Sequence, residues 1–257
     1  LTVAAFIFAP QEQIMRKLSL LILALIALAP AFSQETASTP KKKKFNITDR
    51  AGDHLMLQLG STSWIGAPDS VKSHMKGFNR SANIYAMINK PFKGDPRFSF
   101  AFGLGVGVNN VYFKEMEVDI ASSSAILPFR TTQGTNHFKK YKLSTAYLEA
   151  PLEFRFTANP EMPSKTIKIA LGAKLGTMLN AHTKGKNLLT SNGSALNGFT
   201  QKETSKAYFN TTRLSGTIRA GYGNFSLYSA YTFTNLFKDG VAKSVNPIQF
   251  GITLSGL

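Results

Sequence analysis

The sequence contains no cysteine and, beyond residue 32, no long hydrophobic run. Without cysteine the chain cannot be a lipoprotein, whose lipid is attached to a cysteine after the signal sequence, and it offers no thiolate ligand for zinc. No later segment approaches the roughly 20 apolar residues of a membrane-spanning helix. If the mature chain is embedded in a membrane, it must therefore cross as a β-barrel.

The N-terminus has the pattern of a secretory signal peptide. Met15-Arg16-Lys17 precedes an apolar run at 18–29, and small residues follow up to Ser33. We expect residues 1–33 to comprise an upstream extension and a signal peptide that is cleaved after Ser33. The alternative, a membrane anchor, is disfavoured because the run is short for a span and Pro30 interrupts it.

Acidic residues are scarce. The 257 residues include 14 Asp and Glu against 30 Lys and Arg, which gives a formal net charge of +16. Such a surface favours an anionic partner, and an exported chain meets outer-membrane lipid and lipopolysaccharide rather than nucleic acid. Residues 34–52 contain four consecutive lysines at 41–44 and little apolar content, so they predict a flexible periplasmic lead-in before a domain at 53–257.

Residues 98–108 alternate between large apolar side chains and very small ones. This period of two predicts a β-strand with one apolar face, while Gly103, Gly105 and Gly107 lie on the other. The pattern suits the wall of a closed barrel, with large residues toward lipid and room inside for long side chains from other strands. The glycines do not form a phosphate-binding loop, because they continue the alternation and no helix follows.

Eight strand-like segments follow one another. They cover residues 53–63, 78–90, 97–113, 141–157, 166–181, 207–222, 225–237 and 247–255. Short connections at 91–96, 158–165 and 223–224 alternate with longer polar ones at 64–77, 114–140, 182–206 and 238–246. This asymmetry predicts an all-β fold, an eight-stranded antiparallel up-and-down transmembrane β-barrel with short periplasmic turns and long external loops.

Charged residues occupy the predicted inward faces of three neighbouring strands. They are Glu149, Glu153, Arg155, Lys174, Arg213 and Arg219. Buried charges need partners, and an eight-stranded barrel is wide enough only for side chains, so we expect an ion-paired network that fills the lumen. The alternative is a solvated channel lining.

Basic residues with aromatic neighbours mark the predicted outer boundary of the barrel. They are Lys139, Lys140 and Lys142 beside Phe138 and Tyr141, with Lys184 and Lys186 in the third long loop. Lipopolysaccharide supplies anionic groups at this boundary, so we expect these lysines to contact it. An ordinary solvated loop surface explains the same residues equally well.

Two segments carry a family resemblance. Ala146-Tyr147-Leu148-Glu149-Ala150-Pro151-Leu152-Glu153-Phe154-Arg155-Phe156, followed by Ile169-Ala170-Leu171-Gly172-Ala173-Lys174-Leu175-Gly176, resembles the PorT-like outer-membrane β-barrel proteins of Bacteroidota. The resemblance implies a barrel from about residue 53 onward. The member that gives the family its name is a component of a protein-secretion apparatus, and only the barrel pattern connects this chain with it. Independently of it, Pro151 removes one ladder donor and predicts a bulge or a gap in strand pairing.

Catalysis and metal binding find little support in the sequence. His74, His137 and His182 fall in three different long loops, and their spacing indicates neither a catalytic triad nor a metal site. We therefore expect no enzymatic activity, cofactor or metal. The favoured function is a structural or accessory barrel that binds lipopolysaccharide, a surface ligand or an envelope or secretion complex partner through basic external loops. The alternative is a porin-like channel for small solutes, and an enzyme with its site at the outer rim is less favoured than either.

Overall fold

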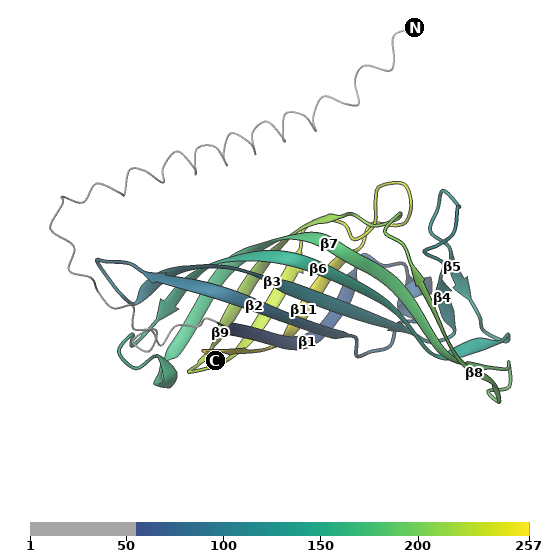
Figure 1. Ribbon diagram of the computed structural model, residues 1–257, viewed down its shortest axis with the longest axis horizontal. Coiled ribbons are helices and arrows are strands. Elements are labelled where there is room, and N and C mark those ends of the chain that lie inside the picture. The colour runs from purple at the N-terminus through teal and green to yellow at the C-terminus, as the bar shows by residue number, and fades with distance from the viewer. Residues whose placement is uncertain (1–54, 257) are drawn as a thin grey trace, which may run out of the picture. The chain divides into compact units, whose positions relative to one another are not determined.

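Eight antiparallel strands close into a barrel in the computed structural model, which describes residues 55–256 (Figure 1). The barrel strands are β1 (Leu55–Ile65), β2 (Arg80–Pro91), β3 (Phe98–Phe113), β6 (His137–Thr157), β7 (Ile167–Leu189), β9 (Thr212–Tyr222), β10 (Phe225–Thr232) and β11 (Asn246–Ser255). Each pairs with the next of these in chain order, and β1 pairs with β11 to close the ring. The predicted fold class is confirmed, whereas the expected signal peptide and lead-in lie outside the described residues.

The two ends of the barrel differ as predicted. Short turns at 92–97, 158–166 and 223–224 define one end, the turn end. Longer connections at 66–79, 114–136, 190–211 and 233–245 define the other, the loop end. The connections also hold a four-residue helix α2 (Asp69–Lys72) and a single 3₁₀ turn η3 (Pro163–Lys165). None of the helices between residues 55 and 256 is long and apolar enough to cross a membrane.

Two strands extend further than their hydrophobic periodicity predicts. β6 begins at His137 instead of residue 141, and β7 runs to Leu189 instead of residue 181. The added length of β7 pairs with β8 (Ala195–Thr204), so the third long loop is largely a hairpin that continues the wall of the barrel. In the second loop, β4 (Met116–Val118) and β5 (Phe129–Thr131) form a separate two-stranded sheet.

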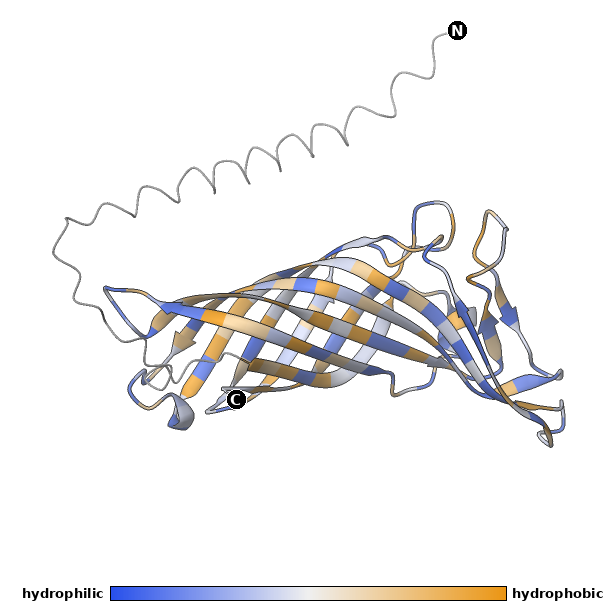
Figure 2. Ribbon diagram, viewed as in Figure 1, coloured by the Kyte–Doolittle hydropathy of each residue, from blue (hydrophilic) through white to orange (hydrophobic). Residues whose placement is uncertain are grey.

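Hydrophobic and polar residues alternate along the barrel strands (Figure 2). The outward positions carry large exposed apolar side chains, such as Leu104 at 56 % and Leu171 at 61 % exposure. On β6 the outward apolar positions run from Ala146 to Phe156. At about 3.3 Å per residue and a tilt of about 40°, this run spans about 25 Å, the height of the lipid-facing band of a membrane barrel. We refer to these outward residues as the apolar band.

The small residues of β3 make room for long side chains, as the alternation predicts. A Cβ on Gly105 would lie 2.6 Å from Cδ1 of Tyr85, and one on Gly107 would lie 2.5 Å from Oε2 of Glu149. Both distances are too short for non-bonded contact, so any larger residue would displace these side chains. Glycine is therefore needed here for close approach within the lumen.

Pro151 lies beside a gap in the ladder, as predicted. The pairing of β3 with β6 passes from Phe102 opposite Leu152 directly to Gly105 opposite Glu149. Pro151 keeps its position opposite Lys174 of β7 on the other side. The missing amide proton is thus accommodated where β6 makes no ladder contact with β3.

Apolar side chains fill the barrel at the loop end. Trp64 of β1 packs edge-on against Phe113 of β3 and against Phe237, with ring centroids 5.8 Å apart in both pairs. Phe209 and Val118 belong to the same buried cluster, which draws on all four long connections. Phe209 and Phe237 were predicted on strands, but they lie in connections because they pack into this cluster. The polar lumen predicted from the sequence is limited to the part nearer the turn end.

Replacing Leu104 by arginine should destabilise the membrane-inserted barrel by about 2–4 kcal/mol, because the side chain lies near the middle of the apolar band on β3. Urea titration in lipid vesicles measures the change. Gln133→Arg places the same side chain on an exposed loop and serves as the control. Equal stability of the two variants would show that Leu104 does not face lipid.

Candidate functional site

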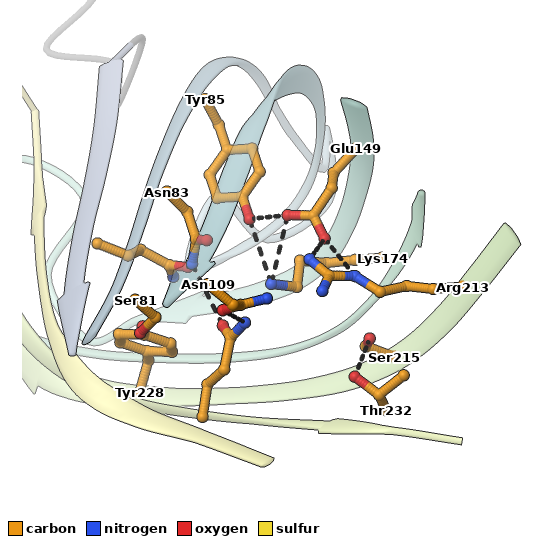
Figure 3. A network of polar contacts seen from close by, with 12 residues as sticks. Ser81, Asn83, Tyr85, Asn109, Glu149, Lys174, Arg213, Ser215, Tyr228 and Thr232 are labelled. Carbon is orange, nitrogen blue, oxygen red and sulfur yellow. Dashed lines mark hydrogen bonds and ion pairs between the residues drawn. The ribbon is translucent and has the colours of Figure 1, made fainter. Parts of the chain in front are cut away.

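One buried carboxylate, that of Glu149 on β6, collects partners from three other strands (Figure 3). Tyr85 of β2 donates its hydroxyl to Oε2 at 2.5 Å, and Arg213 of β9 donates to Oε1 from Nε at 3.0 Å and also from Nη2. Lys174 of β7 lies 3.6 Å from Oε2 and donates to the Tyr85 hydroxyl at 3.2 Å. Glu149 therefore joins four strands across the lumen.

An aromatic ring holds the guanidinium of Arg213 from a second side. The Cζ atom of Arg213 lies 3.9 Å from the ring centroid of Tyr147, which is two residues before Glu149 on β6. A desolvated contact of this kind contributes about 2 kcal/mol. Residues two apart on a strand share a face, so the Tyr-Leu-Glu pattern presents ring and carboxylate to the same cation. Lumen packing is thus a sufficient physical reason for the pattern.

A second ion cluster lies nearer the turn end. Glu153 accepts hydrogen bonds from Arg155 Nε at 2.7 Å and from Arg219 Nη2 at 3.0 Å, and all three residues are buried. The structure thus places the six predicted lumen residues in two clusters, each with one carboxylate and two cations. The glutamates of the two clusters are four residues apart on β6, so one strand carries the acidic residue of both.

Side-chain amides that the sequence analysis did not single out fill the neighbouring part of the lumen. Asn83 Nδ2 donates to Gln58 Oε1 at 3.1 Å and to Gln249 Oε1 at 3.3 Å, and Gln249 Nε2 donates to Asn109 Oδ1 at 2.7 Å. The four amides come from β1, β2, β3 and β11. Their inward positions in the two-residue alternation were the signal that could have identified them.

Two small cavities border these clusters. A cavity of about 10 Å³ borders Arg213, and one of about 40 Å³ borders Arg219. One water molecule needs about 10–15 Å³ on this measure, so these spaces hold a few waters at most. The ion clusters and the amides thus border spaces of the size of a few water molecules.

The predicted basic loop residues lie on strands rather than in loops. Lys139, Lys140 and Lys142 are on β6, and Lys184 and Lys186 are on β7. The strand register places Lys140 opposite Lys186 and Lys142 opposite Lys184. Lys184 also lies opposite Lys202 of β8, whereas Lys139 takes no part in these pairs. The extended β6–β7–β8 sheet therefore carries like charges directly opposite one another.

The same line of cations continues onto the barrel wall. Tyr112 of β3 pairs with Lys142, and the Arg80 guanidinium of β2 lies 5.6 Å from the Tyr112 ring centroid. We call Arg80, Lys142, Lys184 and Lys202 the cationic row. Within residues 55–256 no member of the row forms a salt bridge.

Burial, and after it the clustered positive charge, lowers the pKa of two groups beyond the apolar band. Burial, followed by the charges of Lys184 and Arg80, lowers the pKa of Lys142. Burial, followed by the charges of Lys202, Lys142 and Lys184, lowers the pKa of His182. Like charges directly opposite one another destabilise a sheet. The row therefore stores electrostatic repulsion that a bound anion would relieve.

Three acidic residues surround a cavity between the second loop and the other face of the β6–β7–β8 sheet. Glu203 follows Lys202 and points to the other side of β8, where it lines a cavity of about 150 Å³ with Glu117 and Asp119. Arg130 forms an ion pair with Asp119 at 3.0 Å. Burial, followed by the charge of Glu203, raises the pKa of Glu117. On β8 the alternation thus places Lys202 and Glu203 on opposite faces, and Glu203 meets two carboxylates of the second loop.

The three loop histidines lie on three different elements. His74 follows α2, where its Nδ1 lies 2.8 Å from the carbonyl oxygen of Ser70, whereas His137 begins β6 and His182 lies on β7. Across the described part of the chain, no group of three or more histidine and carboxylate side chains is placed to hold a metal ion.

Comparison with known proteins gives one family match. The family model described as "Outer membrane protein beta-barrel domain" matches residues 32–240. No curated protein sequence matches the chain.

Two solved structures of Ail, the attachment invasion locus protein of Yersinia pestis, are similar to the chain. The structure in complex with the heparin analogue sucrose octasulfate is 12 % identical, covers 78 % of this chain and 94 % of its own, and has a TM-score of 0.30. The structure in a phospholipid bilayer nanodisc is 15 % identical, covers 78 % of this chain and 97 % of its own, and has a TM-score of 0.29. TM-scores this low support no structural conclusion. The assignment of the chain to a family therefore rests on the match to the family model.

Replacing Glu149 by glutamine should destabilise the barrel by about 3–5 kcal/mol, because Arg213 and Lys174 would stay buried without their carboxylate. Denaturant unfolding of the refolded protein measures the loss. Glu161→Gln, at an exposed position of the turn end, should stay within about 0.5 kcal/mol of the native protein. Adding Lys174→Met to the Glu149→Gln variant should restore part of the stability. If Glu149→Gln and Glu161→Gln unfolded alike, Glu149 would not organise the lumen.

Proposed function

This chain belongs to the outer membrane protein β-barrel domain family, and we propose that it is a plugged, non-enzymatic barrel that binds anionic surface ligands at its loop end. The ligand we put first is lipopolysaccharide. Residues 1–33 then serve export, and the short turns face the periplasm while the long connections face outward. The loop end in this orientation meets the anionic outer surface of the membrane.

The observation that carries this proposal is the opposition of lysines across strands. Lys142 and Lys140 lie opposite Lys184 and Lys186 on a sheet that projects beyond the barrel. A soluble loop surface gains nothing from such an arrangement, because like charges directly opposite one another are unfavourable. An anionic ligand converts the same arrangement into a set of convergent ion pairs.

The lumen clusters support binding over solute conduction. Glu149 and Glu153 each bind two cations within the barrel, and the amides of Asn83 and Gln249 lie beside them. An eight-stranded barrel has an interior just wide enough for side chains. We assign no catalytic role to His74, His137 or His182, since no shared site joins them in the described structure.

A protein of an envelope or secretion complex is the second candidate partner. The observation in its favour is the β7–β8 hairpin, where Leu196 and Phe199 are 52 % and 40 % exposed. The PorT-like resemblance adds less, because Tyr147, Glu149 and Glu153 of its motif face the lumen. The motif therefore serves the architecture of the barrel. A partner protein would have to bind the exposed β7–β8 hairpin instead.

The five predicted lysines provide the test of ligand binding. A variant with Lys139, Lys140, Lys142, Lys184 and Lys186 changed to glutamine should lose retention on immobilised lipopolysaccharide. Native retention should fall as salt rises, since exposed charges are screened beyond about 8 Å at physiological ionic strength. Retention of the variant equal to that of the native protein would contradict a role for these residues.

Electrical recording tests the channel alternative. The purified barrel should show no steady conductance in planar bilayers, because ion pairs and amides fill its lumen. Folding of the same sample is verified by its heat-modifiable mobility on gels. Large, long-lived open states would exclude the plugged barrel and favour a solute channel.

A further inference from the structure

We propose that the cationic row binds the phosphate groups of a multiply phosphorylated glycolipid anchored in the outer leaflet. This inference rests on the proposed function and specifies its ligand and site. The site would be the outer surface of β2, β3, β6, β7 and β8, where the row crosses the strands. The acyl chains of the ligand would lie against the apolar band directly below.

The row is continuous across five neighbouring strands. Arg80 is joined to the row by the Tyr112 ring, which pairs with Lys142, and Lys184 and Lys202 follow at matching register positions. Four strand spacings of about 4.8 Å give the row a length of about 19 Å. One phosphate contacts only a part of this length, so the row suits a headgroup with several phosphates.

The cations of the row are free to meet an external anion. Lys142 donates to the neutral amide oxygen of Asn110 at 2.6 Å. Glu203, the residue after Lys202, faces the cavity on the other side of the sheet. Lys140 and Lys186 form a second opposed pair farther out. The outer surface of this sheet therefore gathers cations without acidic neighbours from its own strands.

The position of the row relative to the apolar band selects a membrane-anchored ligand. Arg80 lies two residues beyond the outward Ala82, Lys142 four beyond Ala146, and Lys184 five beyond the exposed Leu179. With a rise of about 3.3 Å and a tilt of about 40°, these positions lie about 5, 10 and 13 Å above the band. Arg80 thus lies near the edge of the hydrocarbon, and Lys142 and Lys184 lie progressively farther above it.

The increasing height of the row's residues above the apolar band distinguishes a glycolipid ligand from a phospholipid ligand. A phospholipid headgroup layer is about 5–7 Å thick on each side of the hydrocarbon. Arg80 lies within that layer, whereas Lys142 and Lys184 lie above it. Phosphates at several heights, as on a phosphorylated saccharide anchored by acyl chains, would reach all members of the row.

The test compares two triple variants of equal charge in mild detergent, by native mass spectrometry of the full chain with added rough lipopolysaccharide. Lys142→Gln, Lys184→Gln and Lys202→Gln remove three members of the row. Lys76→Gln, Lys238→Gln and Lys243→Gln remove three exposed lysines outside it. The row variant should bind about 100-fold more weakly than the native protein, because each lysine near a membrane surface contributes about fivefold in affinity. The control variant should bind within about twofold of native.

Two further measurements keep the result interpretable. Emission from the single tryptophan, Trp64, verifies that the row variant is folded, since this residue is buried at the loop end. Without lipopolysaccharide the row variant should be at least as stable as native, because the opposed lysines no longer repel. Enzymatically dephosphorylated lipopolysaccharide should bind the native protein as weakly as intact lipopolysaccharide binds the row variant.

The outcomes separate this inference from the function on which it rests. Equal losses in both triple variants would overturn the row and leave general binding through basic residues. Equal binding of phosphatidylglycerol and lipopolysaccharide would overturn the glycolipid, and tighter binding of a soluble sulfated polysaccharide would overturn the membrane-anchored ligand. If the native protein bound no anion at all, both the inference and the proposed function would fail.

Discussion

The ionised carboxylate of Glu149 sets the arrangement of the barrel interior. A charge removed from water needs charged partners that also lose their water, and here Arg213 and Lys174 come from two other strands. Tyr85 adds a hydroxyl from a fourth strand, and the space for these groups exists because Gly107 has no side chain. The glycines of β3 and the ion pairs of the lumen are therefore mutually dependent.

A filled interior determines where the barrel can act. Ion pairs and amides occupy the part nearer the turn end, and the aromatic cluster around Trp64 and Phe237 occupies the loop end. Contact with other molecules is then left to the wall, the turns and the projecting β6–β7–β8 sheet. The aromatic cluster also gives this sheet a fixed base, because Tyr141 of β6 donates its hydroxyl to the carbonyl oxygen of Val118 in the second loop at 2.9 Å. A rigid base is what allows opposed charges to stay in register.

The barrel could be predicted from the sequence because a two-residue alternation reports burial locally. That alternation is clear on β3 and on β6, and it also placed Glu149 and Arg213 on inward faces. It fails at the end of β7, where Thr183, Lys184 and Gly185 are polar or small on both faces. The strand continues there because hydrogen bonds to β6 and β8 hold it, and a pairing of distant segments leaves no local signal. The opposition of lysines was hidden for the same reason.

Net charge alone gives an incomplete description of this molecule. Its excess of 16 positive charges implies a uniformly basic surface, yet neighbouring residues of β8 place Lys202 on one face and Glu203 on the other. Glu203 joins Glu117 and Asp119 around a cavity, while Lys202 extends a row of cations. The field of the sheet therefore has a direction, with positive potential on the side that continues the apolar band. An anion approaching from the plane of the membrane meets the cations of the row, whereas one approaching the other face meets the carboxylate of Glu203. Because side chains alternate along a strand, the excess of lysine is concentrated on one face of this sheet, and we expect an anion to bind there in preference to the other face.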